Sequence, residues 1–282
     1  MKQFSSRLPQ RFWALLLVSL LGGVLTMACS KDDTSVDYGP IDDGLIQKYL
    51  TDNNITNAQK QSSGLYFVPV TTNASAPLAT TGQVVSMLYT GQLLNGTVFY
   101  TTAQRSNYPY NFTLGVTQLI AGVTEGVALM HKGDKAILLV PSGLAYRTNA
   151  TGTIPANSVL RFDVEVTDLN ADYKTPDDKA IQKYLTDNNI TNAQKQTSGL
   201  YYVPGTTNPS GAQATAGKTA SVLYTGKYLY GTVFDASSLH GNTPFSFVVG
   251  SGLVIPGWDE GIALMRKGEK GQLLIPSALA YG

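Results

Sequence analysis

The side chains that usually carry out chemistry in proteins are sparse in this sequence. It has one cysteine, Cys29, and two histidines, His131 and His240. No group of residues has metal-ligand spacing, and neither a phosphate-binding loop nor a Gly-x-Ser-x-Gly motif occurs. We interpret both histidines as surface residues. An enzyme built from this chain must therefore work without a nucleophile, a metal or a cofactor.

The remaining candidates for a functional site are aromatic side chains at fixed intervals. Residues 224–226 read Tyr-Thr-Gly, and residues 231–235 read Gly-Thr-Val-Phe-Asp. Pro-Phe-Ser-Phe follows at 244–247, then Leu-Val-Ile-Pro-Gly-Trp-Asp-Glu-Gly at 253–261 and Ala-Tyr-Gly at 280–282. Such residues are suited to an apolar binding pocket, and equally to the ordinary core of a β-rich domain. Their spacing alone leaves both readings open.

The chain contains a long internal repeat. Residues 46–61 recur unchanged as residues 181–196, and the offset of 135 then holds without a gap to the end. Tyr89 thus matches Tyr224, and Tyr146 matches Tyr281. Because solenoid units run only about 20–50 residues, this period predicts a duplicated domain. Features that both copies keep indicate fold or shared function, and differences indicate where one copy has changed.

Each copy is expected to begin with an amphipathic helix. Ile46 and Leu50 share one of its faces, and Asp42 is placed as its N-cap, with Asp177 as the equivalent in the second copy. Strand-like segments dominate from there. The exception is a helical pattern at 123–130 that Gly133 would terminate, matched by a short helix at 258–265.

The strand-like segments indicate an antiparallel sheet. Asn95-Gly96 is the strongest short signal for a hairpin. Residues 136–140 form an apolar run short enough for a buried strand, and residues 158–164 form a closing strand. About five strands, a leading helix and one core helix per copy predict an α+β fold. Residues 174–176 (Lys-Thr-Pro) are expected to mark the linker, giving domains at 37–171 and 172–282.

The second copy lacks a match for the closing strand. The offset of 135 would end it near residue 304, roughly 22 residues beyond the last one. We therefore expect the sequence to be a fragment or a truncated reading frame. We also expect the second domain to be unstable alone or to borrow a strand, because an unpaired edge leaves N–H and C=O groups unsatisfied.

The first 28 residues have the pattern of a secretory signal. A basic start precedes an apolar run of 14 residues, at 12–25, which is too short to span a bilayer comfortably. Residues 25–29 (Leu-Thr-Met-Ala-Cys) resemble a bacterial lipobox, which predicts that Cys29 is lipidated and that 29–36 form a polar tether. This places the protein in a Gram-negative cell envelope, lipid-anchored in the outer membrane. The alternative is an ordinary signal peptide with an incidental cysteine.

Charge argues against a nucleic-acid partner. Without residues 1–28 the chain has 17 basic and 19 acidic residues, and no basic stripe is visible. A single cysteine also excludes a disulfide framework within the chain.

The ordered aromatic motifs resemble those of the FKBP-type peptidyl-prolyl isomerases. The likeness covers about 200 residues across both copies. It implies two domains, each a twisted antiparallel sheet around a short helix. It further implies a pocket with Trp258 as its floor, the Ile255 N–H holding a substrate carbonyl, and Asp235 and the Tyr281 hydroxyl at a polar rim. The walls implied are Tyr224, Phe234, Phe245, Val254 and Ile255.

The first copy carries an altered version of this implied site. Val123 stands where the other copy has Trp258, Tyr100 replaces Asp235, and Arg147 replaces Gly282. We therefore expect weak isomerase activity, or none, from this copy. The site residues that it retains or supplies are Tyr89, Phe99, Tyr110, Leu119, Ile120, Tyr146, Ile154 and Phe162.

The function implied is isomerisation of X–Pro bonds in exported proteins, with proline-containing polypeptides as substrates and macrolides as possible inhibitors. Amide resonance opposes rotation by about 18–20 kcal/mol, and an apolar pocket favours the less polar twisted form. Two alternatives remain open. One is a non-catalytic binder or chaperone of proline-containing or unfolded segments, and the other is a surface interaction protein that kept only the fold.

Overall fold

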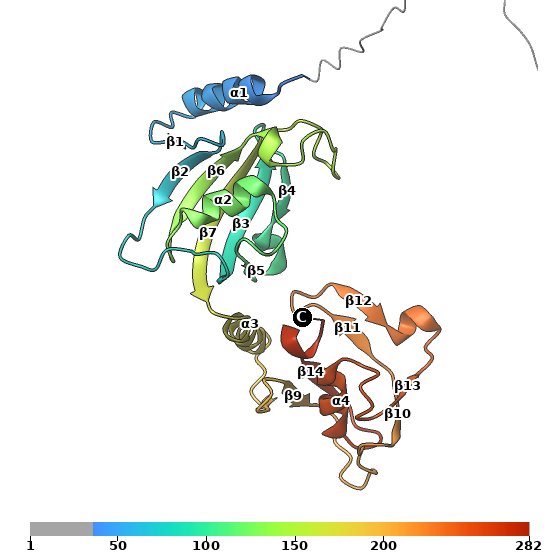
Figure 1. The fold of residues 1–282 in the computed structure, drawn as a ribbon. Helices are drawn as coiled ribbons and strands as arrows, with labels where there is room; N and C mark the ends of the chain where they lie inside the picture. Colours follow the sequence, from blue (N-terminus) through green and yellow to red (C-terminus); the bar gives the residue numbers. More distant parts are fainter. Residues whose placement is uncertain (1–35, 282) are drawn as a thin grey trace, which may run out of the picture. The chain divides into compact units, whose positions relative to one another are not determined.

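The computed structural model describes residues 36–281, which contain both copies, here called repeat one and repeat two (Figure 1). The predicted signal segment, Cys29 and Gly282 lie outside the described residues. Within the described part, no helix is both long and apolar enough to cross a bilayer.

Repeat one is built on an antiparallel sheet of seven strands, in the order β1-β2-β6-β7-β3-β4 with β5 also paired to β3 (Figure 1). The strands are β1 (Gln59–Lys60), β2 (Tyr66–Thr71), β3 (Val84–Leu93), β4 (Val98–Thr101), β5 (Tyr110–Thr113), β6 (Lys135–Val140) and β7 (Leu160–Asn170). β7 lies between β6 and β3 and pairs with both over most of its length. It therefore joins the two halves of the sheet. The predicted hairpin at Asn95-Gly96 connects β3 and β4, where the Leu93 N–H donates to the Thr97 carbonyl.

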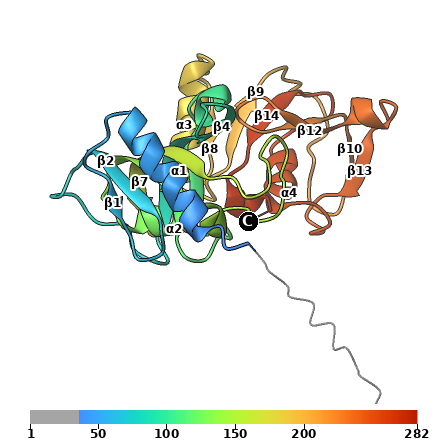
Figure 2. The same cartoon turned by 90° about the horizontal axis from the view of Figure 1, so that it is seen from above.

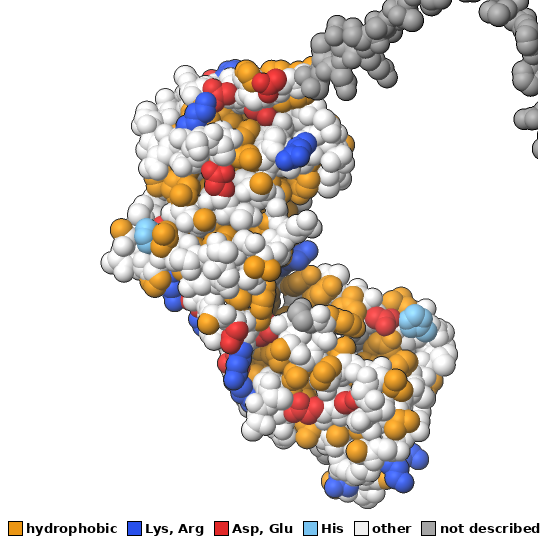
Figure 3. Space-filling model, viewed as in Figure 1, with side chains coloured by type: hydrophobic (Ala, Val, Ile, Leu, Met, Phe, Trp, Pro, Cys, Tyr) orange, Lys and Arg blue, Asp and Glu red, His pale blue; other side chains and the backbone are white. Residues whose placement is uncertain are grey.

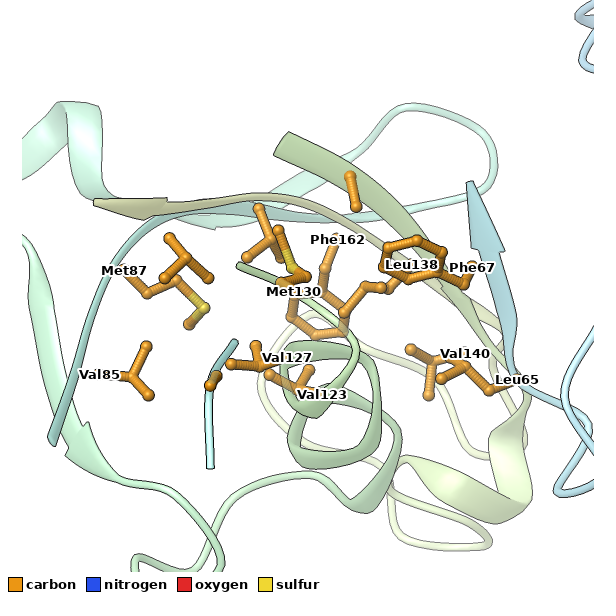
Figure 4. Close-up of a cluster of buried hydrophobic side chains, with 14 of the residues drawn as sticks. Leu65, Phe67, Val85, Met87, Val123, Val127, Met130, Leu138, Val140 and Phe162 are labelled. Carbon is orange, nitrogen blue, oxygen red and sulfur yellow. The ribbon is translucent and has the colours of Figure 1, made fainter. Parts of the chain in front are cut away.

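Helices cover both faces of this sheet (Figures 1 and 2). α2 (Ala121–Ala128) packs on one face through Val123 and Val127, as Figure 4 shows, and α1 (Gly39–Asp52) packs on the other. Successive side chains of β6 point to opposite faces of the sheet, so this strand contacts both helices. Leu138 belongs to the cluster around α2, and Leu139 belongs to the cluster around α1. Short 3-10 turns follow β4 and β6, as η1 (Thr102–Arg105) and η2 (Ser142–Leu144).

The prediction that Asp42 caps the leading helix is wrong. The helix begins at Gly39 with Tyr38 as N-cap, so Asp42 lies inside its first turn and is buried. The Asp42 carboxylate accepts hydrogen bonds from the backbone N–H and the hydroxyl of Ser142, at 2.8 and 2.7 Å. Asp177 accepts the same pair of bonds from Ser277, at 2.8 and 2.7 Å. The aspartate therefore fastens each leading helix to the 3-10 turn 100 residues later in the chain.

The helix boundaries also differ from those predicted. α2 and its counterpart α4 (Pro256–Ala263) each begin and end two residues earlier than expected, so α2 ends well before the Gly133 that was expected to stop it. Residues 174–176 are not a linker but the first turn of α3 (Lys174–Asp187). Pro176 fits there because a first-turn N–H has no partner within the helix to lose.

Repeat two has counterparts of these elements other than β7, in smaller sheets. Its strands are β8 (Gln194–Lys195), β9 (Tyr201–Pro204), β10 (Thr219–Val222), β11 (Thr225–Lys227), β12 (Val233–Ala236), β13 (Phe245–Val248) and β14 (Gly271–Leu274). They form three separate antiparallel sheets, β14-β9-β8, β10-β13 and β11-β12. The position equivalent to the first residue of β7 would fall beyond residue 282, so no described strand joins these sheets. The 3-10 turns η3 (Ser237–His240) and η4 (Ser277–Leu279) complete this repeat.

Candidate active site

The first turn of α4 places Trp258. Pro256 starts the helix, and Gly257 and Gly261 lie on the side that packs against the end of β14 and the residues after it. A Cβ at Gly257 would come within 2.4 Å of the Ile275 side chain, so this face admits no larger residue. The close contact on one side directs the indole to the other, toward Tyr224 and β13.

Three aromatic rings surround the indole of Trp258. The Tyr224 ring meets it edge-on with 5.1 Å between centroids, and the Phe245 and Phe247 rings lie at 5.9 and 5.8 Å. Phe247 is buried, whereas Trp258 is half-buried and Phe245 is 44% exposed. Figure 3 shows apolar side chains gathered over β11 and β12 of repeat two, with an acidic side chain and a histidine beside them. The indole is thus part of an aromatic cage that solvent reaches.

A polar group borders the cage. The Tyr224 hydroxyl donates to Asp235 Oδ2 at 2.6 Å, and His240 Nε2 lies 2.8 Å from Asp235 Oδ1. The hydrogen bonds from Tyr224 and then from His240 lower the pKa of the Asp235 carboxyl. The same bond raises the pKa of the Tyr224 hydroxyl. Near neutral pH the rim therefore carries a carboxylate and a neutral phenol.

Val254 and Ile255 precede α4 and are both half-buried. Ile255 is the N-cap residue of α4, and its backbone N–H has no acceptor among the described residues. The structure therefore leaves a backbone donor at the N-terminal end of the helix that carries Trp258. Such a donor has the geometry to bind a carbonyl group.

Phe234 stands apart from the cage, and Tyr281 is largely exposed. The Phe234 side chain is 50% exposed and packs on Tyr228, with ring centroids 5.3 Å apart. Its counterpart Phe99 instead packs edge-on against Phe162 at 5.8 Å, and the match to Phe162 falls beyond residue 282. Tyr281, whose hydroxyl was expected at the polar rim, is 83% exposed.

Repeat one gathers its retained residues but fills their space differently. The Tyr100 ring stacks on Tyr89 with centroids 4.6 Å apart and planes 14° apart, whereas Asp235 at the matching position accepts a hydrogen bond from the Tyr224 hydroxyl. Val123 is buried in the core on α2 (Figure 4). Of the eight residues expected at this site, Ile154 and Phe162 belong to the buried hydrophobic cluster of repeat one. The other six are partly buried and pack against it: Tyr89, Phe99, Tyr110, Leu119, Ile120 and Tyr146.

Sequence reasoning missed His240 as a rim residue. It is exposed, as expected of a surface histidine, but it contacts Asp235 five residues earlier. The signal was available, because an Asp and a His around a 3-10 turn are close in space. His131 is only partly exposed, and its ring nitrogen lies 3.2 Å from Asp134.

The leading helices also border equivalent hollows, which the sequence did not indicate. Their volumes are about 520 and 560 Å³, and their linings are identical in residue type. The first is lined by Gln47, Leu50, Thr51, Asn54, Ile55, Thr56, Ala58, Lys60 and Tyr66. Both hollows are open, with mixed polar and apolar linings, and the lysine in each is paired: Lys60 contacts Asp43 and Lys195 contacts Asp178, each at 2.5 Å. The aromatic cage is the better candidate for an apolar substrate.

Comparisons with known proteins identify the family. The family model for FKBP-type peptidyl-prolyl cis-trans isomerase matches residues 76–167 and 211–282. The mouse peptidyl-prolyl cis-trans isomerase FKBP9 is 31% identical over 202 residues, which cover 71% of this chain and 31% of that protein. The human peptidyl-prolyl cis-trans isomerase FKBP10 is 31% identical over 202 residues, which cover 71% and 30%. The chain thus spans about a third of the length of these relatives.

A shorter relative agrees with this assignment, and one solved structure is also similar. FK506-binding protein 2 of Candida glabrata is 47% identical over 90 residues, covering 31% of this chain and 65% of that protein. The crystal structure of FkpA from Escherichia coli matches with a TM-score of 0.42 and 29% identity, covering 48% of this chain and 62% of that one. The chain belongs to the FKBP-type peptidyl-prolyl cis-trans isomerase family and carries two family segments in tandem. The family and the α+β fold expected from the sequence are confirmed.

Proposed function

We propose that the chain catalyses cis–trans isomerisation of X–Pro bonds and that the cage in repeat two is the active site. The observation that carries this proposal is the half-buried indole of Trp258 among the rings of Tyr224, Phe245 and Phe247. Proline-containing polypeptides are the substrates, and macrolides are expected ligands because the family binds both.

The mechanism requires no covalent step. Rotation about the X–Pro bond disrupts amide resonance, so the carbonyl oxygen carries less negative charge in the twisted form than in the planar one. An apolar cage that excludes water favours the less polar form, and this difference lowers the barrier. In this proposal Trp258 and Phe245 hold the prolyl ring. The Ile255 N–H binds a neighbouring carbonyl and fixes the peptide, while Asp235 and Tyr281 contact its polar backbone.

A protease-free isomerisation assay on the full chain tests this function. Uncatalysed X–Pro isomerisation takes tens to hundreds of seconds at 25 °C, so acceleration is easily measured. Trp258→Val introduces the residue that repeat one already has at this position and is expected to lower kcat/KM by about tenfold or more, which is about 1.4 kcal/mol. Phe245→Ala is expected to act in the same direction. The matched change Tyr110→Ala in repeat one is expected to leave the rate unchanged.

Two results of this assay would contradict the proposal. An accelerated rate that survives Trp258→Val, with circular dichroism showing a folded protein, would move the catalytic site away from the cage. A rate no faster than that of the free peptide would leave the chain without this activity.

For repeat one, we propose that isomerase activity is weak or absent. The Tyr100 ring covers Tyr89, and Val123 supplies no ring at the position of the indole. Substrate would have to displace an aromatic stack, which is worth about 0.5–1.5 kcal/mol. The activity that remains in the Trp258→Val chain measures the contribution of repeat one. A rate equal to that of wild type would contradict the proposal that repeat one is weak or inactive.

A second candidate function is the holding of unfolded segments. It is favoured by the exposed apolar side chains near the cage, where Leu253 is 78% and Phe234 is 50% exposed. Holding depends on exposed apolar area, whereas catalysis depends on the indole. Suppression of aggregation that persists in the Trp258→Val chain would therefore show a binding activity separate from isomerisation.

We also propose that the clients are exported proteins and that lipid at Cys29 anchors the chain in the outer membrane of a Gram-negative bacterium. The support is the pattern of residues 1–29. Metabolic labelling with a fatty-acid analogue is expected to mark the wild-type chain and not Cys29→Ala. Equal labelling of both would exclude this anchor.

A further inference from the structure

The two copies agree most closely around the hollow beside each leading helix. Residues 46–61 and 181–196 are identical, and eight of the nine residues that line each hollow fall within these segments. At the candidate active site the copies differ, because Val123 stands where the other copy has Trp258. With volumes of about 520 and 560 Å³, the hollows have the size of small-ligand pockets, about 300–1,000 Å³. They are therefore candidates for a second kind of site.

Contacts within the fold account for part of this identity. Asn53 and Asn57 each donate a side-chain hydrogen bond to a backbone carbonyl, at 2.8 and 2.9 Å. Asparagine also suits the backbone of Asn54, whose φ is 54°. Thr56 is exposed and lines the hollow, and its hydroxyl takes no part in the hydrogen bonds among the described residues. Its match Thr191 has the same features, so this hydroxyl is kept twice without a role in the fold.

The charge of the lining favours a neutral ligand. Its one cation, Lys60, contacts Asp43 at 2.5 Å, and the Tyr66 hydroxyl also donates to Asp43 at 2.7 Å. The hydrogen bonds from Lys60 and then from Tyr66 lower the pKa of Asp43, and the bond to Asp43 raises the pKa of Lys60. Near neutral pH the two charges therefore cancel. The nine lining residues include no carboxylate, so neither an anion nor a metal ion would find an unpaired counter-charge.

The lining combines polar groups of one kind with a small apolar surface. Threonine hydroxyls and the carboxamides of Gln47 and Asn54 can both donate and accept hydrogen bonds. The apolar part of the lining consists of Leu50, Ile55 and Ala58. A sugar ring presents several adjacent hydroxyls, each a donor and an acceptor, beside faces of C–H groups. An extended peptide presents one N–H and one C=O per residue, so the hollow matches a saccharide better.

We propose that each hollow binds a neutral saccharide. In repeat one the Thr56 hydroxyl and the Asn54 carboxamide hydrogen-bond to sugar hydroxyls, while Ile55 contacts a C–H face. Thr191 and Asn189 have the same roles in repeat two. The chain therefore has two saccharide sites of the same specificity, because their linings are identical in residue type. This activity lies outside the proposed isomerase function and does not depend on it.

The test measures amide NMR shifts of the isotope-labelled full chain on addition of maltohexaose, cellohexaose or chitotetraose as neutral probes. At least one of them is expected to shift the amides of Thr56 and Thr191, with a Kd of about 0.1–1 mM at each, the strength of a few exposed hydrogen bonds. The anionic tetragalacturonate is expected to bind more weakly, because the lysine of the lining is already paired.

Variants assign the shifts to the hollows. Thr56→Val keeps the shape of the side chain and removes the hydroxyl, and it is expected to raise the Kd in repeat one about five- to tenfold without changing that in repeat two. Thr191→Val is expected to do the reverse. Asn54→Gly removes the carboxamide, keeps a residue that tolerates positive φ and should act as Thr56→Val does. Thr72→Val changes an exposed threonine outside the hollow and is the matched control, with no expected effect.

Other results would overturn the proposal. One is the absence of shifts at residues 46–61 and 181–196 with every neutral probe, and another is a Kd that Thr56→Val leaves unchanged. Tighter binding of tetragalacturonate than of the neutral probes would contradict the neutral character of the hollow. If the peptide Ala-Leu-Pro-Phe shifts these amides and no saccharide does, the hollow is a peptide site and the proposal fails.

Separate readouts distinguish this inference from the isomerase activity. A chain with both Thr56→Val and Thr191→Val is expected to isomerise X–Pro bonds as wild type does, since both threonines lie in the hollows. Trp258→Val is expected to keep both saccharide affinities. Saccharide binding without accelerated isomerisation would support the hollows and contradict the proposed activity, and accelerated isomerisation without saccharide binding would do the opposite.

Discussion

At the scale of single residues, position 100 in repeat one and its match 235 in repeat two decide what contacts the tyrosine that both copies share. Tyr100 covers the face of Tyr89 with its own ring, whereas Asp235 holds the hydroxyl of Tyr224 and leaves that ring against Trp258. Together with the exchange of Val123 for Trp258, this difference replaces an internal stack on the shared tyrosine with a contact to the indole.

Removing the Tyr100 ring should open the site of repeat one. In a chain that also carries Trp258→Val, Tyr100→Ala is expected to increase binding of a proline-containing peptide, because the face of Tyr89 becomes available. Isothermal calorimetry measures this gain. Asp235→Ala in the same Trp258→Val background is the matched control and should produce none. Unchanged binding after Tyr100→Ala would show that the stack does not block the site.

The lowered pKa of Asp134 predicts how acid changes the stability of repeat one. Its buried carboxylate accepts the backbone N–H of His131 at 2.7 Å and that of Asn73. Burial alone would raise the pKa of Asp134, but these bonds outweigh it, and the pKa is lowered. Because the folded pKa lies below the unfolded one, the stabilisation is present above about pH 4 and is lost as the pH falls through the folded value.

Asp134→Asn should therefore cost about 1.5–3 kcal/mol of unfolding free energy at pH 7 and much less at pH 3. Urea unfolding at both pH values, followed by circular dichroism, measures the two costs. An equal cost at both would mean that the charge of Asp134 does not matter. Lys48→Ala changes an exposed residue paired with Asp52 and is a suitable control, with an expected cost below about 0.5 kcal/mol.

At the scale of elements, the leading helix and its 3-10 turn act as one unit in both repeats. Residues 46–61 are identical to 181–196, whereas 44 of the next 86 positions are identical. The bonds from Ser142 to Asp42 are reproduced within 0.1 Å between Ser277 and Asp177. The strongest sequence match thus lies in the helix and the segment after it, and not in the cage.

Asp42→Ala should destabilise repeat one by about 1.5–3 kcal/mol, since it leaves the buried N–H and hydroxyl of Ser142 without their acceptor. Asp177→Ala is the matched variant. A smaller cost is expected there, because Asp177 and Ser277 are both only half-buried. Chemical denaturation of the two variants compares them. Equal costs would contradict the role of burial in this contact.

The elements also show how far the sequence predicts this structure. The repeat, the hairpin at Asn95-Gly96 and the α+β fold could be predicted, because they depend on local patterns and on matching copies. The role of Asp42 could not, since its partner lies 100 residues away and a first-turn aspartate looks like a cap. Tyr224, Phe245 and Trp258 were expected at one site through family resemblance, whereas Phe247 was not. The exposure of Phe234 was not predicted. In repeat one the matching Phe99 packs against the ring of Phe162, and the exposure of Phe234 depends on whether such a partner ring is present.

At the scale of the whole molecule, the two repeats differ in how their sheets are joined. β7 pairs with β3 and β6 and unites seven strands in repeat one, whereas the described strands of repeat two form sheets of two and three strands. Small sheets are marginal in water, and buried N–H groups without partners cost free energy. For the described residues, this difference in sheet size predicts that the two repeats do not unfold together.

Thermal unfolding of the full chain with Trp13→Phe should show two transitions. Trp258 emission reports repeat two and should change at a lower temperature, while the main loss of circular dichroism follows when the seven-stranded sheet of repeat one melts. Asp42→Ala provides an internal control, because it should lower only the second transition. Coincident midpoints for both probes, with a single calorimetric peak, would show that repeat two is as stable as repeat one without a joining strand. The same experiment with a macrolide present should raise only the Trp258 transition, since a ligand stabilises only the part of the molecule that binds it.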